Sequence, residues 1–223
     1  MNKAEQKALL NILFFPILFL IIMWAVKLVE YTFGFSFADY GVYPQSLSGL
    51  KGILFSPFIH KDFSHIVNNS YPVLILGGML FFFYKEIAKQ LFLWLFFIAG
   101  FWLWIIGRPS FHIGASGIIY ALASFLFISG VIRENPRLSA ISMVIIFMYG
   151  SMIWGVLPTK EPVSWEGHLS GFFAGILVAI FYRGKGPKRK KYQWEIDEES
   201  EEKFLKENEL KINYTLKKDD NRN

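Results

Sequence analysis

The chain of 223 residues contains no cysteine, and its first 182 residues carry little charge. The absence of cysteine excludes disulfide bonds, thiolate catalysis and cysteine-ligated metal sites. Residues 183–223 hold 12 of the 23 Lys and Arg residues and 10 of the 18 Asp and Glu residues, which leaves 11 basic and 8 acidic side chains for everything before them. With 53% hydrophobic residues overall, this uneven distribution indicates that the charge-poor part lies in a membrane.

The charge-poor part is divided into six apolar blocks, and blocks of about 17–25 residues are typical of membrane-spanning helices. We expect spans at Leu9–Val29, Ile66–Tyr84, Gln90–Ile106, Ser116–Ile132, Leu138–Leu157 and His168–Tyr182. The first block is too long for a signal peptide and has no small-x-small cleavage site, so we interpret it as an anchor. The sequence therefore predicts an all-α polytopic membrane protein, a bundle of six transmembrane helices.

Basic residues gather at alternate ends of these blocks. Pairs of Lys or Arg precede the first block and follow the second and fourth, and the run "RGKGPKRKK" follows the sixth. By the positive-inside rule, both termini are predicted to be cytoplasmic. The connection 30–62 is then external, and its piece "LSGLKGILFSPFIH" mixes apolar and polar residues as a helix lying in the membrane interface does.

The predicted organisation has three parts. A short cytosolic N-terminus covers residues 1–8, the six-helix core covers residues 9–183, and a charged, solvated cytosolic tail covers residues 184–223. The basic residues of this tail are concentrated in the run that directly follows the last predicted span. A basic segment directly after a span is typical of the cytoplasmic membrane face, so we expect contact with lipid and no nucleic-acid partner.

Strongly polar side chains are rare within the predicted spans, and three of them share one depth. Asn69, Ser116 and His168 lie roughly 22, 24 and 21 Å from the cytoplasmic ends of their helices, at about 1.5 Å rise per residue. Because a hydrocarbon core is about 30 Å thick, all three are expected several ångströms beneath the outer surface. A polar side chain at that depth costs free energy unless it faces protein or water, so these three are candidate functional residues.

Ser116 and His168, predicted at the same depth, are the residue types that nucleophilic catalysis uses as nucleophile and base. The His168 imidazole is suited to take the proton of the Ser116 hydroxyl, because histidine titrates near neutral pH. Ser116 is predicted to begin a helix, whose first N–H groups lack intrahelical acceptors and can bind an oxyanion. Asn69 adds an amide, and His65, one turn earlier on the same face, adds a ring N–H. Tyr120, one turn after Ser116, offers an aromatic face to the histidine ring.

No acidic residue is placed to orient His168. Glu166 is the nearest carboxylate in the sequence, but residues two apart on a helix face different directions, so we predict a dyad. A metal site is disfavoured because the spacing of His60 and His65 does not place both on one helical face, and no glutamate stands between them as a zinc-protease motif requires. We assign His60 to water handling or loop structure, and we assign no role to His112 in its short predicted external loop.

At these residues the sequence resembles the rhomboid family of intramembrane serine proteases. The family pattern is His-x4-His-x3-Asn in the second span, Gly-x-Ser-Gly opening the fourth, and a histidine followed by small residues in the sixth. The chain presents the pattern in order, as His60, His65 and Asn69, then Gly114, Ser116 and Gly117, then His168, Gly171 and Gly175. The resemblance covers about residues 9–183.

The resemblance implies that Ser116 is the nucleophile and His168 the general base of a serine endopeptidase. The oxyanion site that it implies consists of Asn69, His65 and the Ser116 N–H, supported by Gly114, with Tyr120 packed on the catalytic histidine. It also implies cleavage in or near transmembrane segments of other membrane proteins, no cofactor, and a place in the cell membrane of a prokaryote. The spacing of Gly171 and Gly175 predicts a close approach of the fourth and sixth spans.

One departure from the family pattern stands in the first external loop. Many rhomboids carry a Trp-Arg pair shortly before the first histidine, where this chain has Lys51 and Gly52. The alternative function is a catalytically silent rhomboid-like protein that binds or remodels membrane clients. A transporter or channel would require charged residues deep in the spans or broken helices in paired halves, and the sequence has neither. The oligomeric state is left open.

Overall fold

The computed structural model describes residues 2–158, 164–187 and 192–207. Part of the predicted basic run, 188–191, and the end of the predicted tail, 208–223, lie outside the described residues. The chain divides into two units, Met1–Arg189 and Lys190–Asn223. The second unit contains the helix α8 (Gln193–Glu207), and the first contains all the elements discussed below.

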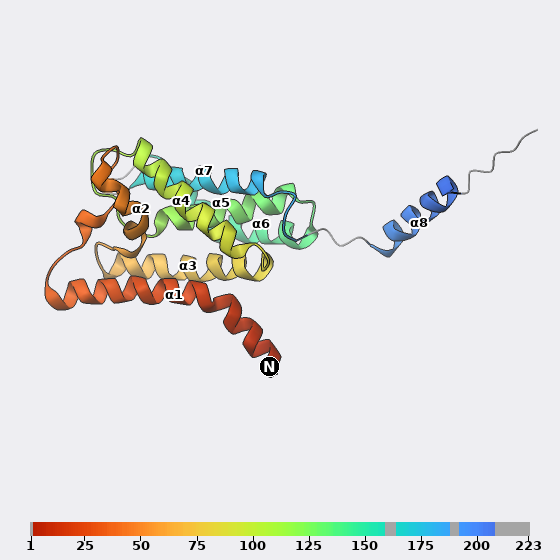
Figure 1. The fold of residues 1–223 in the computed structure, drawn as a ribbon, viewed down its shortest axis with the longest axis horizontal. Coiled ribbons are helices and arrows are strands. Elements are labelled where there is room, and N and C mark those ends of the chain that lie inside the picture. Colours follow the sequence, from red (N-terminus) through yellow and green to blue (C-terminus); the bar gives the residue numbers. More distant parts are fainter. Residues whose placement is uncertain (1, 159–163, 188–191, 208–223) are drawn as a thin grey trace, which may run out of the picture. The chain divides into compact units, whose positions relative to one another are not determined.

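The first unit is a helical bundle, shown in Figure 1. Its helices are α1 (Lys3–Phe33), α3 (Phe63–Phe83), α4 (Ala88–Ile106), α5 (Ser116–Ile132), α6 (Pro136–Tyr149) and α7 (Trp165–Phe181), with the short α2 (Lys51–Phe55) between α1 and α3. Figure 1 shows α1 and α3 side by side along one edge of the bundle. The described residues contain no β-strand, only an isolated antiparallel bridge between Val42 and His112. The predicted all-α bundle is confirmed.

Four segments of the described chain are long and apolar enough to cross a membrane. They are Lys3–Phe33, Phe63–Phe83, Ala88–Ile106 and Pro136–Val156. The apolar helices α5 and α7 have 17 residues each and therefore span about 25 Å at 1.5 Å per residue. Large apolar side chains face outward from the bundle, as Phe147 of α6 and Phe181 of α7 do, which suits contact with lipid. The total of six spans stays a prediction.

The predicted fifth span is not one continuous α-helix. The α-helical part ends at Tyr149, and the 3₁₀ helix η4 (Gly150–Val156) continues the chain. A 3₁₀ segment leaves backbone carbonyls available to other partners, because its hydrogen bonds have poorer geometry than those of an α-helix. Two of these carbonyls, those of Met152 and Gly155, accept hydrogen bonds from side chains of α5 and α7.

Helix α5 lies at the centre of the bundle and packs against α3, α4, α6 and α7. Its approach to α7 is very close, because a Cβ at Gly171 would overlap the Gly117 carbonyl oxygen and a Cβ at Gly175 would overlap the Ser124 hydroxyl. The predicted role of Gly171 and Gly175 in helix packing is confirmed. Glycine at these two positions brings the first turn of α7 against the first turn of α5.

The connection between α1 and α3 folds into short helical turns rather than one interfacial helix. The predicted piece forms η2 (Leu47–Leu50), α2 and η3 (Ser56–Phe58). The Lys27 ammonium on α1 donates to the carbonyl oxygens of His60 at 2.9 Å and Lys61 at 3.0 Å, and it pairs with Glu30 at 3.1 Å. Glu30 in turn accepts the Phe37 N–H at 2.7 Å. These contacts hold the connection between α1 and α3 in place, although this chain lacks the Trp-Arg pair.

Candidate active site

Ser116 and His168 meet across the interface of α5 and α7. The Ser116 Oγ lies 3.0 Å from the His168 Nε2, although the two residues are 52 positions apart in the sequence. Ser116 is the first residue of α5, and His168 lies in the first turn of α7. The close helix packing therefore brings the two predicted side chains within hydrogen-bonding distance.

The second ring nitrogen of His168 determines which tautomer the site holds. The His168 Nδ1 lies 2.8 Å from the carbonyl oxygen of Gly155. A carbonyl only accepts, so Nδ1 carries the proton and Nε2 presents its lone pair to the Ser116 hydroxyl. Glu166 is occupied elsewhere, because its Oε1 lies 3.6 Å from the Arg108 Nε. A backbone carbonyl of η4, rather than a carboxylate, orients the histidine.

Tyr120 holds the same histidine from its face. Its ring is stacked on the His168 ring, with centroids 4.2 Å apart and an interplanar angle of 10°. Its hydroxyl donates to the Met152 carbonyl oxygen at 2.7 Å. Sequence reasoning placed Tyr120 here but missed Met152 and Gly155. The available signal was the glycine at each end of the segment 150–155, which favours a break in the fifth span.

Donors for an oxyanion gather beside Ser116. Asn69 is buried, and its Nδ2 has no hydrogen-bond partner among the described residues. Gly114 has φ of +107°, and a Cβ there would lie 2.7 Å from the His65 Cε1, so both backbone and space require glycine. The same Cβ position is 3.7 Å from the Asn69 Nδ2. The structure thus brings His65 and Asn69 of α3 against Gly114, which lies two residues before Ser116.

Ser116 begins α5 without a side-chain cap, and this adds backbone donors to the same place. The first N–H groups of a helix have no intrahelical acceptor and carry the positive end of the helix dipole. A buried donor without a hydrogen-bond partner destabilises the protein by about 1–3 kcal/mol. An anion that forms near the Asn69 amide would give it a partner and remove this cost. These donors can stabilise a negative charge that forms next to the Ser116 hydroxyl.

Ser116 and His168 both line a cavity of about 690 Å³. It lies at the end of the bundle where α3, α5 and α7 begin. Its polar lining residues are Lys61, Asp62, His65, Asn68, Asn69, Arg108, Ser110, His112, Ser116, Tyr120, Tyr149, Ser164 and His168, and the apolar side chains of Pro72, Phe111, Ile113, Ile119 and Met152 complete the wall. The Asp62 carboxylate accepts the His65 N–H at 2.8 Å and caps α3, and this bond holds the pKa of Asp62 below its usual value. Water and a peptide both fit in a space of this size.

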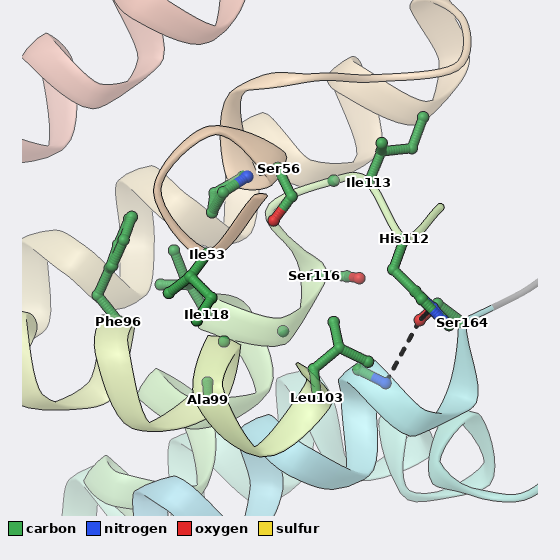
Figure 2. Close-up of a pocket in the computed structure, with 15 residues that line it drawn as sticks. Ile53, Ser56, Phe96, Ala99, Leu103, His112, Ile113, Ser116, Ile118 and Ser164 are labelled. Atoms are coloured by element: carbon green, nitrogen blue, oxygen red, sulfur yellow. Dashed lines mark hydrogen bonds between the residues drawn. The ribbon is translucent and has the colours of Figure 1, made fainter. Parts of the chain in front are cut away.

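A second, much smaller pocket of about 30 Å³ lies on another side of Ser116. Figure 2 shows Ile53, Phe96, Leu103 and Ile118 around it. The Ser116 side chain points toward the part of the pocket where His112 and Ser164 meet (Figure 2). A cavity of this volume admits a small group such as a methyl or a water molecule.

His60 is buried beside the site without taking part in its hydrogen bonding. Neither of its ring nitrogens has a hydrogen-bond partner among the described residues, and its ring lies 4.9 Å from that of His65. Burial, and next the nearby His65, lower the pKa of His60 to about 3, so this ring is neutral. Within residues 2–158, 164–187 and 192–207, no group of three His, Asp or Glu side chains is arranged to hold a metal ion.

Comparison with known proteins gives one family. The family model described as the Rhomboid domain matches residues 48–185. Uncharacterized proteins of Mycobacterium tuberculosis and Mycobacterium bovis are 31% identical over 185 residues, which covers 77% of this chain and 75% of each relative. An uncharacterized protein of Mycobacterium leprae is 30% identical over 185 residues, which covers 77% of this chain and 71% of that protein. These relatives are bacterial. The family-model match over residues 48–185 includes every residue of the site.

Proposed function

The chain belongs to the rhomboid family, and on that basis we propose that it is an intramembrane serine endopeptidase with a Ser116–His168 dyad. One observation carries the proposal: the Ser116 Oγ lies 3.0 Å from the His168 Nε2, while Nδ1 is held by the Gly155 carbonyl. That arrangement leaves the ring nitrogen facing serine free to accept a proton. The family and the apolar helices indicate an integral membrane protein.

The first half of the reaction forms an acyl-enzyme. The Ser116 Oγ attacks the carbonyl carbon of the scissile peptide bond as its proton passes to the His168 Nε2. The carbonyl oxygen becomes an oxyanion that accepts hydrogen bonds from the Ser116 N–H, the Asn69 amide and the His65 ring. As the C–N bond breaks, the Nε2 proton moves to the leaving amine, which departs with its part of the substrate.

The second half uses water from the cavity. Nε2 of His168 takes a proton from a water molecule, and the resulting hydroxide equivalent attacks the acyl carbon on Ser116. The oxyanion forms again at the same donors and then expels the Ser116 Oγ, which recovers its proton from Nε2. The products are a carboxylic acid and an amine, and the enzyme returns to its starting state.

The substrates are transmembrane segments of other proteins, which must unwind locally to react. A helix hides its carbonyl groups in i→i−4 hydrogen bonds, so the scissile stretch has to leave helical form before Ser116 reaches it. The pocket of about 30 Å³ beside Ser116 favours a small residue before the cut. Helix-destabilising residues near the cleavage site are therefore expected in good substrates.

The proposed placement in the cell follows from the distribution of basic residues. Residues 1–8 and the tail 184–223 lie in the cytoplasm of a prokaryotic cell, the core 9–183 lies in its cell membrane, and the cavity opens to the exterior. Reporter fusions at residues 35 and 223 test this orientation. An external reading from a fusion at residue 223 contradicts it.

Cleavage by the purified protein tests the enzyme proposal. We expect the wild-type protein in detergent to cut a reporter transmembrane substrate, and we expect Ser116→Ala and His168→Ala each to abolish the cut. Ser139→Ala serves as the control, because its hydroxyl bonds only to carbonyl oxygens of Gly130 and Asn135, away from the cavity. If Ser116→Ala cuts as fast as the wild type, the assignment of the nucleophile is wrong.

The same assay separates this function from the alternative. A catalytically silent client-binding protein would retain the substrate in a pull-down and leave it uncut at every enzyme concentration. A fluorophosphonate reagent adds a reading that needs no substrate, since it labels only a serine with an activated hydroxyl. We expect labelling of the wild type at Ser116 and none in His168→Ala.

A further inference from the structure

His112 is a buried histidine that the proposed chemistry does not use. Its side chain is 3% exposed, and it lies four residues before Ser116 in the segment that joins α4 to α5. The His112 Nδ1 lies 2.6 Å from the Ser164 Oγ, and Figure 2 shows the two side chains next to each other. Ser164 is the N-cap of α7 and stands four residues before His168. One hydrogen bond therefore joins the two segments that lead into the two reacting residues.

The backbone of His112 is fixed independently of its side chain. Val42, in the connection between α1 and α3, donates its N–H to the His112 carbonyl oxygen at 2.9 Å and accepts the His112 N–H at 2.8 Å. Gly107 packs against the ring, since a Cβ there would lie 3.2 Å from the His112 Nε2. The imidazole thus extends from an anchored strand-like segment toward α7.

The protons around His112 are consistent with one arrangement. The Ser164 Oγ accepts the Gly167 N–H at 3.3 Å, which leaves its own proton free to be donated to the His112 Nδ1. The Nε2–H then donates to the Arg108 carbonyl oxygen at 3.1 Å, and the Ser110 Oγ, 3.4 Å from the same nitrogen, is a second, more distant acceptor. This chain requires a neutral ring with its proton on Nε2. Burial lowers the pKa of His112 and so favours the neutral form.

A second contact ties the same two segments. Arg108, at the start of the α4–α5 connection, lies 3.6 Å from the buried Glu166, which is two residues before His168. The first turn of α7 is therefore held to the α4–α5 connection at Ser164 and at Glu166. The Arg108–Glu166 contact acts through charge over a longer distance, whereas the His112–Ser164 bond is short and directional.

We propose that His112 is a positioning residue, and this proposal rests on the proposed function. Through its hydrogen bond to Ser164, His112 sets the register of α7 and hence the 3.0 Å separation of Ser116 and His168. It donates no proton to the substrate. It holds the N-cap of α7 in place while the Gly155 carbonyl and Tyr120 fix the ring of His168. A displacement of about 1 Å between reacting groups costs on the order of a hundredfold in rate, so this restraint has a measurable effect.

Two substitutions at His112 separate positioning from packing. His112→Leu keeps an apolar side chain of similar volume but has no acceptor for the Ser164 hydroxyl. His112→Asn places an amide oxygen near the position of Nδ1, where it accepts that hydroxyl proton. We expect kcat to fall about 10- to 100-fold in His112→Leu with KM within about twofold of wild type, and to recover to within about threefold in His112→Asn.

Ser164→Gly tests the bond from its other end. Glycine at an N-cap costs only a few tenths of a kcal/mol, so α7 keeps its start while the hydroxyl is lost. We expect the same loss of kcat as in His112→Leu, and no further loss when the two changes are combined. Ser139→Ala, which removes a helix-bonding hydroxyl away from the cavity, should keep wild-type kcat.

Several outcomes overturn the proposal. Wild-type kcat in His112→Leu does so, as does an equal loss in the Leu and Asn variants, which would indicate packing alone. If His112→Leu does not fold, Ser164→Gly decides, and unchanged kcat in that variant overturns the proposal. A crystal structure of either variant gives a reading that does not depend on cleavage. If Ser116 and His168 lie beyond hydrogen-bonding distance in the variant, that structure supports the positioning role, even if the wild-type protein cleaves no substrate. If the distance is unchanged, the positioning role is refuted.

Discussion

The carbonyl oxygen of Gly155 lies 2.8 Å from the Nδ1 of His168, at the place where a serine-protease triad has its carboxylate. The carbonyl fixes the tautomer as a carboxylate does, but it carries only a partial charge. In the proposed reaction it would therefore stabilise the His168 imidazolium less strongly than a carboxylate. Because this carbonyl belongs to the 3₁₀ segment η4, the orientation of the base depends on the conformation of that segment.

Enlarging Gly155 should disturb the orientation of the His168 ring while Ser116 and His168 themselves stay unchanged. A Cβ in Gly155→Ala would overlap the Tyr120 hydroxyl and lie 3.2 Å from the His168 Nδ1. We expect kcat to fall about 10- to 100-fold, because η4 must move away and take its carbonyl with it. Gly150→Ala is the matched control, since a Cβ there meets nothing within 4 Å. Equal activity of the two variants in the cleavage assay would contradict this role of η4.

The two contacts of Tyr120 should be separable by substitution. Tyr120→Phe keeps the stack on His168 and loses the hydrogen bond to the Met152 carbonyl, whereas Tyr120→Leu loses both. Aromatic stacking contributes about 0.5–1.5 kcal/mol, so Tyr120→Leu should be about 2- to 10-fold slower than Tyr120→Phe. Steady-state kcat values measure the difference. A Leu variant as fast as the Phe variant would show that the stack does not position the base.

Asn69 should contribute to the transition state and little to substrate binding. Its buried Nδ2 has no partner among the described residues, so it is free to donate to an oxyanion. Removal of one such donor costs on the order of a hundredfold in kcat, and we expect that loss in Asn69→Ala with KM nearly unchanged. Asn68→Ala, the neighbouring cavity-lining residue, is the control. A rise in KM with kcat intact would instead assign Asn69 to substrate binding.

Burial of His60 should make the folded protein less stable in acid. Its pKa is lowered from 6.5 to about 3 by desolvation, so between these values the unfolded chain binds a proton that the folded chain does not. Stability is then greatest above the unfolded pKa and falls as pH decreases, by about 1.4 kcal/mol per pH unit for one fully shifted group. His65, Lys27 and Asp62 also act on this ring, with smaller effects.

His60→Leu isolates this contribution, because leucine fills the buried site and does not titrate. We expect the melting temperature of the wild type in detergent to drop between about pH 7.5 and pH 4.5 by more than that of His60→Leu. The other histidines remain in both proteins, so the difference between the two drops belongs to His60. Parallel drops would show that His60 accepts a proton in the folded state.

Much of the site was predictable because its residues stand at helix starts. Ser116 opens α5 and His168 lies in the first turn of α7, so counting residues from the basic ends placed both at one depth. The spacing of His65 and Asn69 gave their common face on α3 in the same way. The glycines at positions 171 and 175 indicated close packing because small residues allow helices to approach. All of these arguments use periodicity and composition along one helix.

The hydrogen-bond and stacking partners of His168 were not predictable by such arguments. Gly155 and Met152 act through backbone carbonyls, which every residue has, so no side-chain pattern marks them. The break of the fifth span into η4 is what exposes those carbonyls, and sequence periodicity treated the span as continuous. His112 was read as a plain loop residue, because its burial arises from contacts with Val42 and Ser164, which are distant in the sequence.

The sequence by itself determined the all-helical membrane architecture, since hydrophobic block length and charge distribution follow directly from the cost of placing polar groups in lipid. It also determined which side chains are chemically able to react. The tertiary structure decided which nitrogen of His168 faces Ser116, what holds that ring, and how the start of α7 is tied to the segment before α5. Those features depend on hydrogen bonds between residues far apart in the chain, and such bonds are fixed only when the helices pack.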